Sequence, residues 1–508
     1  MREKLLLLAA ALIAFGAAVA GSFHFDDYAL LVDSVITGAD GWWRAWMPLQ
    51  TRPLTWFTFW ANFAAAGADP LLWHLVNLAL HLACVLAAYA VLRRILGSRA
   101  GWIAAALFAV HPTVTEPVAY ISARGTLLAT LFCLLSLGCW LRSRPWIAVA
   151  LFAAALLAKE ECAAFPVFLL LLEWSTRGLP QASTWKSRLR DGAPIAAMLL
   201  LSLAAGLRVI WASQYLAGSG IASSAGISAG SYFATQGAVI LRYFRMLVMP
   251  LGFTPDPEIA LRGPATGALA WACVVAAAVV AASWFYRARA GFWFLAGLVL
   301  LLPSSSIFAA SDLAADRRMY LPLIAFAACA ALLLEKLDAR IAFALVLSLA
   351  LISVRQSLVW RTEESLWTEA VRLAPSKIRP RIQLARALPW HRAIAVIDDA
   401  KRLAPNDADL ASEEGRIHLS AGRPELALNA FGRALALRPG DPKALNNRGA
   451  TLLALDQRDA AKADFEAALR HNPCLIDPRK NLRAMGVDDL KTVPWPSSCT
   501  PAIASNVR

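Results

Sequence analysis

Long apolar segments limit most strongly what this chain can fold into. They are confined to about the first 358 of 508 residues, and 58% of the chain is hydrophobic while only 17% is charged. We expect roughly eleven membrane crossings, because a helix needs roughly 20 apolar residues to span a bilayer and tilted helices can be shorter. The segments are 5–21, 71–92, 100–112, 118–141, 145–158, 162–173, 193–212, 267–286, 291–308, 319–334 and 341–358. The sequence therefore predicts an all-α, polytopic membrane helix bundle over residues 1–358.

Basic residues fall on alternate connections between these segments. They are Arg2 and Lys4; Arg93, Arg94 and Arg99; Arg142 and Arg144; Arg177, Lys186, Arg188 and Arg190; Arg287 and Arg289; and Lys336 and Arg340. Since Lys and Arg collect on the cytoplasmic side, this pattern predicts a cytoplasmic N-terminus and, after an odd number of crossings, an external C-terminal part. In a bacterial inner membrane that side is the periplasm. The net charge of +14 thus reflects topology, and we expect no nucleic-acid partner.

Two segments leave alternatives open. Residues 1–21 can be a retained helix or a cleaved signal peptide, because Arg2 and Lys4 precede an apolar run that ends in small residues. Residues 233–250 are long enough to cross but carry Arg242 and Arg245 near the centre. We expect this second segment to lie along the outer face, with its arginines toward lipid headgroups or a substrate phosphate.

The C-terminal third carries an internal repeat. Pro405, Pro439 and Pro473 are separated by 34 residues twice, the period of tetratricopeptide repeats. Further positions recur at the same spacing: Gly415, Ala427, Phe431 and Ala434 return as Gly449, Ala461, Phe465 and Ala468. We expect a solenoid of about three and a half repeats at 359–486, followed by a Pro-rich tail at 487–508. It can be a folded spacer or a groove for a protein partner.

The cysteines predict one disulfide and no metal site. Six lie in or beside apolar runs without metal-ligand spacing: Cys84, Cys133, Cys139, Cys162, Cys273 and Cys329. Cys474 and Cys499 lie in the soluble part, which the charge pattern places in an oxidising compartment. We therefore expect a Cys474–Cys499 bridge that pins the Pro-rich tail.

Four charged clusters adjoin the apolar segments. Ionisable residues beside membrane helices are costly, so each cluster is a candidate site. They are Asp26 and Asp27, followed by Arg52; His111 and Glu116, with Arg124; Lys159 and Glu160; and Asp316, Arg317 and Arg318, with Tyr320. The plain alternatives are solvated helix ends and snorkelling side chains. Together on the outer face, however, these clusters indicate a pocket for an anionic, lipid-linked substrate.

Several short motifs follow one another in a fixed order. They are Asp26-Asp27, Arg52-Pro53-Leu54-Thr55, Trp73 to Asn77 with His81, His111-Pro112 to Glu116, Lys159-Glu160, Arg318 to Pro322, and then the repeats. This order resembles the transmembrane and tetratricopeptide-repeat-containing O-mannosyltransferases of the GT-C superfamily, over nearly the whole chain. Asp316 departs from the pattern, since a glutamate is expected before the arginine.

The resemblance implies transfer of a sugar from a polyprenyl phosphate, of the undecaprenyl type in a bacterium, to a hydroxyl group on the outer face. A carboxylate, Asp27 or Asp26, would accept the proton of the attacking hydroxyl. Glu116, His111, Lys159 and Glu160 would position the acceptor or the base. The leaving phosphate would be bound by Arg52, Arg124, Arg317, Arg318 and Tyr320. Inversion at the anomeric carbon follows if the base and the phosphate lie on opposite sides of the sugar. The sequence contains no nucleotide-sugar loop or metal-ligand set, so we expect no metal or other cofactor.

Two other classes of function fit the same segments. A membrane scaffold or lipid transporter would use the repeats to bind a partner, and an oligosaccharide ligase would take a lipid pyrophosphate donor. One helix would be enough to anchor a scaffold, so roughly eleven segments with charged loops favour an enzyme.

Overall fold

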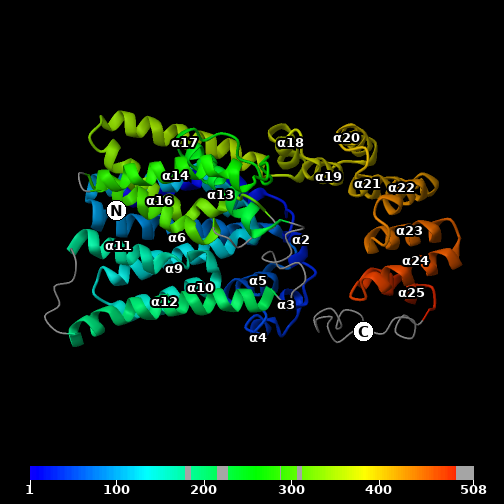
Figure 1. Ribbon diagram of the computed structural model, residues 1–508, viewed down its shortest axis with the longest axis horizontal. Coiled ribbons are helices and arrows are strands. Elements are labelled where there is room, and N and C mark those ends of the chain that lie inside the picture. The colour runs from blue at the N-terminus through cyan, green and yellow to red at the C-terminus, as the bar shows by residue number, and fades with distance from the viewer. Residues whose placement is uncertain (178–184, 214–226, 286–287, 306–311, 488–508) are drawn as a thin grey trace. The chain divides into compact units, whose positions relative to one another are not determined.

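The chain forms helices and turns throughout the described residues of the computed structural model, which are 1–177, 185–213, 227–285, 288–305 and 312–487 (Figure 1). It divides into two compact units, Met1–Thr362 and Glu363–Arg508. The first unit holds the apolar segments and the second holds the repeats. The first unit ends at Thr362, close to the change in composition after residue 358.

The first unit is a bundle of apolar helices. Within the described residues, 7 helices are long and apolar enough to cross a membrane: Arg2–Ala20, Pro70–Leu96, Ile121–Trp140, Gly192–Ala212, Pro264–Phe285, Asp316–Leu334 and Ala339–Val359. They contain α1 (Arg2–Phe15), α6 (Pro70–Leu96), α9 (Arg124–Trp140), α12 (Trp185–Ser213), α14 (Pro264–Phe285), α16 (Tyr320–Leu334) and α17 (Ala339–Val359). The four remaining predicted segments correspond to shorter helices, α7 (Ser98–Val110), α10 (Pro145–Ala158), α11 (Phe165–Arg177) and α15 (Arg289–Leu301). The prediction of a polytopic helix bundle is confirmed.

Small side chains allow the central helices to pack closely. Helix α7 lies against α6 and α16, and its alanines from Ala104 to Ala106 are 0–1% exposed. Close approach of helix backbones is how membrane helices gain packing energy, because lipid offers no hydrophobic driving force between them. This packing explains why a helix of 13 residues can sit inside the bundle.

Helix α1 belongs to the same core. Ala11, Ala14 and Phe15 are fully buried, and Ser357 Oγ in α17 donates to the Ala14 carbonyl at 2.9 Å. These contacts tie the first helix of the unit to its last.

Helix α13 (Ala229–Val248) covers the segment whose placement the sequence left open. Among the described residues, this helix is not one of the 7 that are long and apolar enough to cross a membrane. Arg242 forms an ion pair of 2.5 Å with Asp316, and the two side chains are 11% and 4% exposed. Arg245 is exposed. The expected contact of these arginines with headgroups or phosphate stays a prediction.

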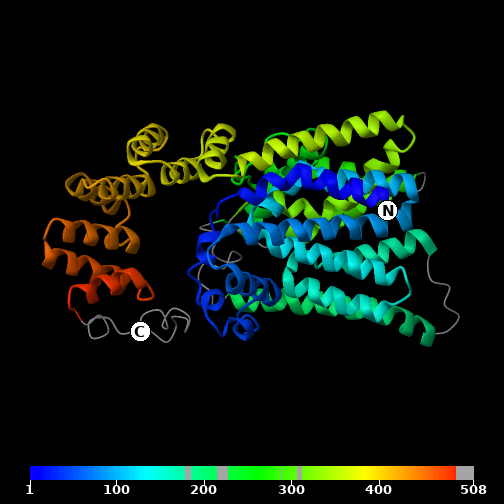
Figure 2. The same ribbon diagram turned by 180° about the vertical axis from the view of Figure 1, so that it is seen from behind.

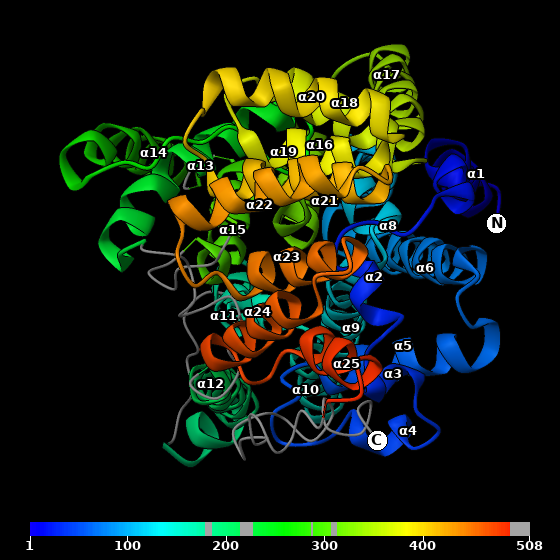
Figure 3. The same cartoon turned by 90° about the vertical axis from the view of Figure 1, so that its right-hand side faces the viewer.

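The second unit is a stack of antiparallel helix pairs. The helices are α18 (Glu363–Leu373), α19 (Ile378–Ala387), α20 (Trp390–Leu403), α21 (Ala408–Ser420), α22 (Pro424–Leu437), α23 (Pro442–Ala454), α24 (Arg458–His471) and α25 (Ile476–Ala484). Figure 3 shows α21 beside α22 and α23 beside α24, as their contacts require.

The recurring glycines explain how the pairs pack. A Cβ on Gly415 would lie 2.8 Å from the Phe431 ring, and one on Gly449 would lie 2.7 Å from the Phe465 ring. Each ring is fully buried against the facing helix. The predicted tetratricopeptide solenoid is confirmed at the positions that defined it.

Cys474 is disulfide-bonded, and its predicted pairing with Cys499 stays a prediction. Cys474 follows α24, where its backbone N–H donates to Asn472 Oδ1 at 3.1 Å. Cys499 lies outside the described residues. Five of the basic residues on which the predicted topology rests have side chains outside the described part of the structure. They are Arg177, Lys186, Arg188, Arg190 and Arg287.

Candidate active site

Short helices and turns gather at one end of the membrane unit, away from the N-terminus of α1 (Figure 2). They are α2 (Asp27–Leu30), α3 (Ser34–Thr37), α4 (Gly41–Arg44), the start of α5 (Pro53–Ala66), η2 (Pro112–Val114), α8 (Thr115–Ala119), η3 (Ile121–Ala123), η4 (Glu160–Cys162), η5 (Leu302–Ser304) and η6 (Asp316–Met319). All four charged clusters lie on these elements or on the residues directly next to them.

Asp27 is buried, and both of its carboxylate oxygens accept hydrogen bonds. Its Oδ1 accepts from the backbone N–H and the hydroxyl of Ser122 at 2.8 and 2.6 Å, and its Oδ2 accepts from the His24 N–H at 3.1 Å. The side chain is 0% exposed. Burial raises the pKa of Asp27 to about 6, although these hydrogen bonds and His24 act in the opposite direction. Asp27 thus fastens the start of α2 to η3.

Asp26 is the exposed member of the pair. Its Oδ2 accepts a hydrogen bond of 2.9 Å from the Tyr120 hydroxyl. The preceding residue, Phe25, has a φ of 45°, an uncommon left-handed backbone for a bulky residue. The sequence could not separate the two aspartates, and the structure gives them different surroundings.

Tyr120 connects this aspartate to a second cluster. Burial and the charges of Asp26 and Asp27 raise the pKa of its phenol, so it remains a hydrogen-bond donor at neutral pH. The guanidinium of Arg317 lies 5.9 Å from the centre of its ring. Tyr120 therefore stands between a carboxylate and a cation.

Arg317 forms an ion pair with Glu116. The Arg317 guanidinium donates to Glu116 Oε1 at 2.5 Å, and the Arg317 backbone N–H donates to Oε2 at 2.9 Å. A second carboxylate, Asp312, lies 3.2 Å from the guanidinium. Arg317 remains 24% exposed, whereas Glu116 is 6% exposed. The predicted role of Glu116 is thus accompanied by a structural one, since it orients Arg317.

Arg318 donates to backbone and hydroxyl oxygens nearby. Its partners are the Asp312 carbonyl at 2.8 Å, the Leu313 carbonyl at 3.3 Å and the Tyr232 hydroxyl at 3.4 Å. These contacts hold the guanidinium next to Arg317. The two cations on η6 therefore occupy fixed positions.

Two further ion pairs complete the charged end. Arg52 donates to both carboxylate oxygens of Glu160, at 3.0 and 2.5 Å, and stays 41% exposed. Burial opposes ionisation of Glu160, but Arg52 lowers its pKa to about 2. Lys159 Nζ lies 2.9 Å from Glu161 and donates to Thr126 at 2.8 Å. Burial lowers the pKa of Lys159, and Glu161 acts against that shift.

Contacts link the four predicted clusters. Tyr120 joins the stretch after Glu116 to Asp26, Arg317 joins η6 to Glu116, and Arg52 joins the first loop to Glu160. Exposed carboxylate and guanidinium groups thus collect at one end of an apolar bundle. Such an arrangement can bind an anion and remove a proton beside it.

Three predicted residues serve the fold instead. Arg124 is fully buried and donates to Asn77 Oδ1, the Thr58 carbonyl and the Trp73 carbonyl at 2.8, 3.2 and 3.1 Å. Tyr320 is buried, with its hydroxyl 2.8 Å from His81 Nδ1. We withdraw both from the phosphate-binding set, because both side chains are fully buried, whereas Arg52, Arg317 and Arg318 remain partly exposed.

His111 is the third of these residues. Its Nδ1 lies 2.9 Å from Thr113 Oγ1 at the start of η2, and burial lowers its pKa to about 4. The imidazole is therefore neutral at pH 7. A neutral, buried ring does not support the predicted role in positioning the acceptor.

Several residues at the charged end of the bundle were not predicted from the sequence. Tyr120, Ser122, Asp312 and Trp360 all touch the charged groups or their partners. Tyr120 and Ser122 follow Glu116 by a few residues, and this closeness was an available signal. Trp360 is distant in sequence, and no local pattern marks it.

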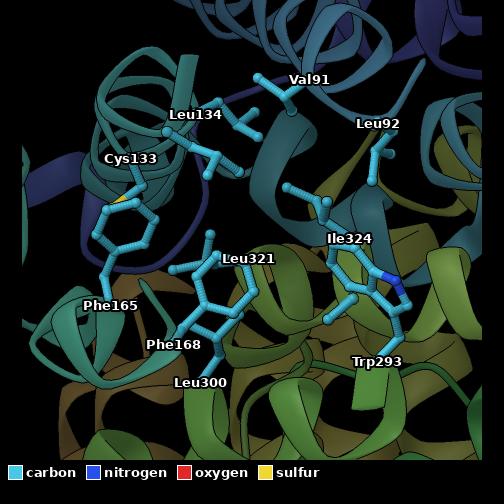
Figure 4. Close-up of a pocket in the computed structure, with 12 residues that line it drawn as sticks. Val91, Leu92, Cys133, Leu134, Phe165, Phe168, Trp293, Leu300, Leu321 and Ile324 are labelled. Atoms are coloured by element: carbon cyan, nitrogen blue, oxygen red, sulfur yellow. The ribbon is translucent and has the colours of Figure 1, made fainter. Parts of the chain in front are cut away.

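An apolar cavity lies elsewhere in the bundle (Figure 4). Its lining comes from α6, α9, α11, α15 and α16, and includes Cys133, Leu134, Phe165, Phe168, Trp293 and Ile324. This lining offers no polar surface. Such a lining suits hydrocarbon and would leave charged groups unpaired.

Comparison with known proteins finds curated relatives in animals. Protein O-mannosyl-transferase F38B6.6 of Caenorhabditis elegans is 26% identical over 425 residues, which are 76% of this chain and 60% of the relative. Protein O-mannosyl-transferase Tmtc1 of Drosophila melanogaster is 36% identical over 162 residues, 28% of this chain and 19% of the relative. Human protein O-mannosyl-transferase TMTC4 is 32% identical over 201 residues, 31% of this chain and 27% of the relative. The chain thus spans 60% or less of the length of these relatives.

Solved structures give weak likenesses, and no family model matches the chain. ArnT from Cupriavidus metallidurans, bound to undecaprenyl phosphate, aligns with 92% of this chain and 79% of its own, with a TM-score of 0.38 and 14% identity. The Cut9–Hcn1 hetero-tetramer of APC/C aligns with 90% of each chain, with a TM-score of 0.24 and 12% identity. Scores this low do not define a shared fold. By its sequence, this multi-pass membrane protein is similar to the protein O-mannosyl-transferases, the family that its motifs resemble.

Proposed function

We propose that this protein is a membrane glycosyltransferase that moves a sugar from a polyprenyl phosphate to a hydroxyl group, with Asp26 as the general base. The observation that carries the proposal is the contact of an exposed carboxylate, Asp26, with a phenol that lies against the Arg317 guanidinium. A proton acceptor and an anion-binding cation are the two groups that this reaction requires.

Transfer of the sugar needs no reactant besides the donor and the acceptor hydroxyl. The acceptor oxygen attacks the anomeric carbon and gives its proton to the Asp26 carboxylate. The bond between that carbon and the phosphate oxygen breaks, and its electron pair leaves on the polyprenyl phosphate. Attack from the side opposite to the phosphate inverts the anomeric centre. Asp26 later returns its proton to water.

Asp27 and Tyr120 have supporting roles in this scheme. Asp27 anchors the turn that presents Asp26, since its two oxygens are held by Ser122 and His24. The Tyr120 hydroxyl orients the Asp26 carboxylate and leaves its second oxygen for the acceptor. We therefore assign the base to Asp26 rather than Asp27.

The donor phosphate would be held by Arg317, Arg318 and Arg52. Arg317 and Arg52 are partly exposed, at 24% and 41%, and each already faces a carboxylate that fixes its orientation. Charge-assisted, bidentate contacts from such fixed guanidinium groups suit a phosphate. Lys159, paired with Glu161 and bonded to Thr126, would hold the turn that carries Glu160.

The names of the relatives suggest the finer details. They point to mannose as the sugar and to protein hydroxyl groups as acceptors. An undecaprenyl-type carrier suits a bacterial envelope, with the charged end and the repeat unit on the periplasmic face of the inner membrane. The repeat unit would bind the acceptor protein or another partner.

Comparison of envelope proteins with and without this chain tests the function. We expect intact-mass spectra of cells that express the chain to show proteins heavier by one hexose, or by several, on Ser or Thr. Cells that express the Asp26→Asn variant should lack this increase. Unchanged protein masses together with newly glycosylated lipids would move the acceptor class, and unchanged masses of both would favour the scaffold or transporter alternatives.

A further inference from the structure

The chain that leaves the membrane unit returns to the candidate base. Trp360 follows the last residue of α17 and is 3% exposed. Its ring lies 6.1 Å from Tyr120, 6.4 Å from Phe25 and 5.6 Å from His24, measured between ring centres. These three residues surround or directly precede Asp26.

Main-chain contacts fasten the same two segments. The His24 ring, through Nε2, lies 2.7 Å from the Trp360 carbonyl oxygen. The Ser22 backbone N–H donates to the Arg361 carbonyl at 3.2 Å. Residues 22–25 are thus clamped to residues 360–361 across more than three hundred positions of sequence.

The backbone at Phe25 needs such a clamp. A φ of 45° is costly for a bulky residue and persists where surrounding contacts enforce it. The Phe25 ring packs edge-on against Tyr120 at 5.6 Å and against Trp360. Removing the indole would leave a gap on one side of both rings.

We propose that Trp360 is a positioning residue for the Asp26 base: its ring and carbonyl hold Phe25, Tyr120 and His24, and so fix the carboxylate. This proposal rests on the proposed function. It goes further in making the base depend on the connection to the repeat unit, which begins at Glu363. A displacement of residues 360–361 would loosen the turn that carries Asp26.

The test compares the full-length Trp360→Ala, Trp360→Phe and Tyr120→Phe variants. We expect Trp360→Ala to lower kcat for transfer from undecaprenyl phosphate mannose by about 10- to 100-fold with little change in donor KM, as a displaced catalytic group does. Trp360→Phe should keep most of the activity. Trp293→Ala is the matched control, since Trp293 is also 3% exposed but lines the apolar cavity.

A double variant separates positioning from general destabilisation. Trp360→Ala and Tyr120→Phe both act on the hydrogen bond from the Tyr120 hydroxyl to Asp26 Oδ2, the first through the packing of the Tyr120 ring. Each single variant should therefore lower kcat with little change in donor KM. The two changes should be non-additive when combined.

A structural readout keeps this proposal separate from the proposed function. Hydrogen exchange at residues 22–28 should accelerate in Trp360→Ala and stay unchanged in Trp293→Ala. If the wild-type protein transfers no sugar but this exchange pattern appears, the clamp stands and the function fails. Full activity in Trp360→Ala, or equal losses of activity in Trp360→Ala and Trp293→Ala, would overturn the positioning role.

Discussion

Asp26→Asn is expected to lower sugar transfer by about 10²- to 10⁴-fold, the usual contribution of a general base. The amide keeps the shape of the carboxylate and can still accept the Tyr120 hydrogen bond, but it cannot take a proton. Transfer of radiolabelled mannose from undecaprenyl phosphate mannose, in membranes with matched protein levels, measures the loss. Thermal unfolding should be almost unchanged, since Asp26 is exposed.

Two neighbouring aspartates are the controls. Asp40 is exposed on the same loop region, 3.4 Å from Arg44, and Asp40→Asn should keep activity within about twofold. Asp27→Asn should lower both activity and unfolding temperature, because an amide cannot accept from Ser122 and His24 on both of its ends. Normal transfer by Asp26→Asn together with complete loss in a well-folded Asp27→Asn would return the base to Asp27.

Arg317→Gln is expected to lower transfer by about 10²- to 10³-fold, the scale of losing one group that stabilises developing charge. The leaving phosphate would lose a guanidinium that Glu116 and Asp312 hold in place. Initial rates at several donor concentrations would measure the loss in kcat/KM.

A double variant distinguishes substrate binding from charge balance. Arg317→Gln alone leaves the buried Glu116 carboxylate without its cation, which destabilises the fold. Adding Glu116→Gln removes that unpaired charge and should restore protein levels without restoring transfer. Recovery of transfer in the double variant would show that Arg317 serves only to neutralise Glu116.

The repeat unit could be predicted in detail because its contacts are local. A glycine and the phenylalanine that covers it are separated by 16 residues in both repeats, Gly415 with Phe431 and Gly449 with Phe465. A fixed spacing of small and large residues therefore encodes the packing directly. The membrane helices could also be predicted, because a helix that crosses lipid needs a long apolar segment.

The roles of single charged residues could not be predicted in the same way. Asp26 and Asp27 are adjacent in sequence, and their burial is set by Tyr120 and Ser122, roughly a hundred residues later. Arg124 is identified as a candidate phosphate ligand by its position, yet its guanidinium is used by Asn77 and two backbone carbonyls. Arg242 forms an ion pair with Asp316, which is 74 residues away in the sequence. Such pairings depend on tertiary contacts that no local pattern contains.

Sugar transfer by the purified, full-length protein tests the central claim most directly. The protein in detergent or lipid nanodiscs would be given undecaprenyl phosphate mannose and a Ser/Thr-rich peptide, without added metal, and the products would be followed by mass spectrometry and by the anomeric configuration of the new bond. The account predicts a peptide heavier by one hexose, joined with inverted configuration, release of undecaprenyl phosphate, and loss of both products with Asp26→Asn. Folded wild-type protein that leaves the donor intact, or an equal product yield from wild type and Asp26→Asn, would contradict it.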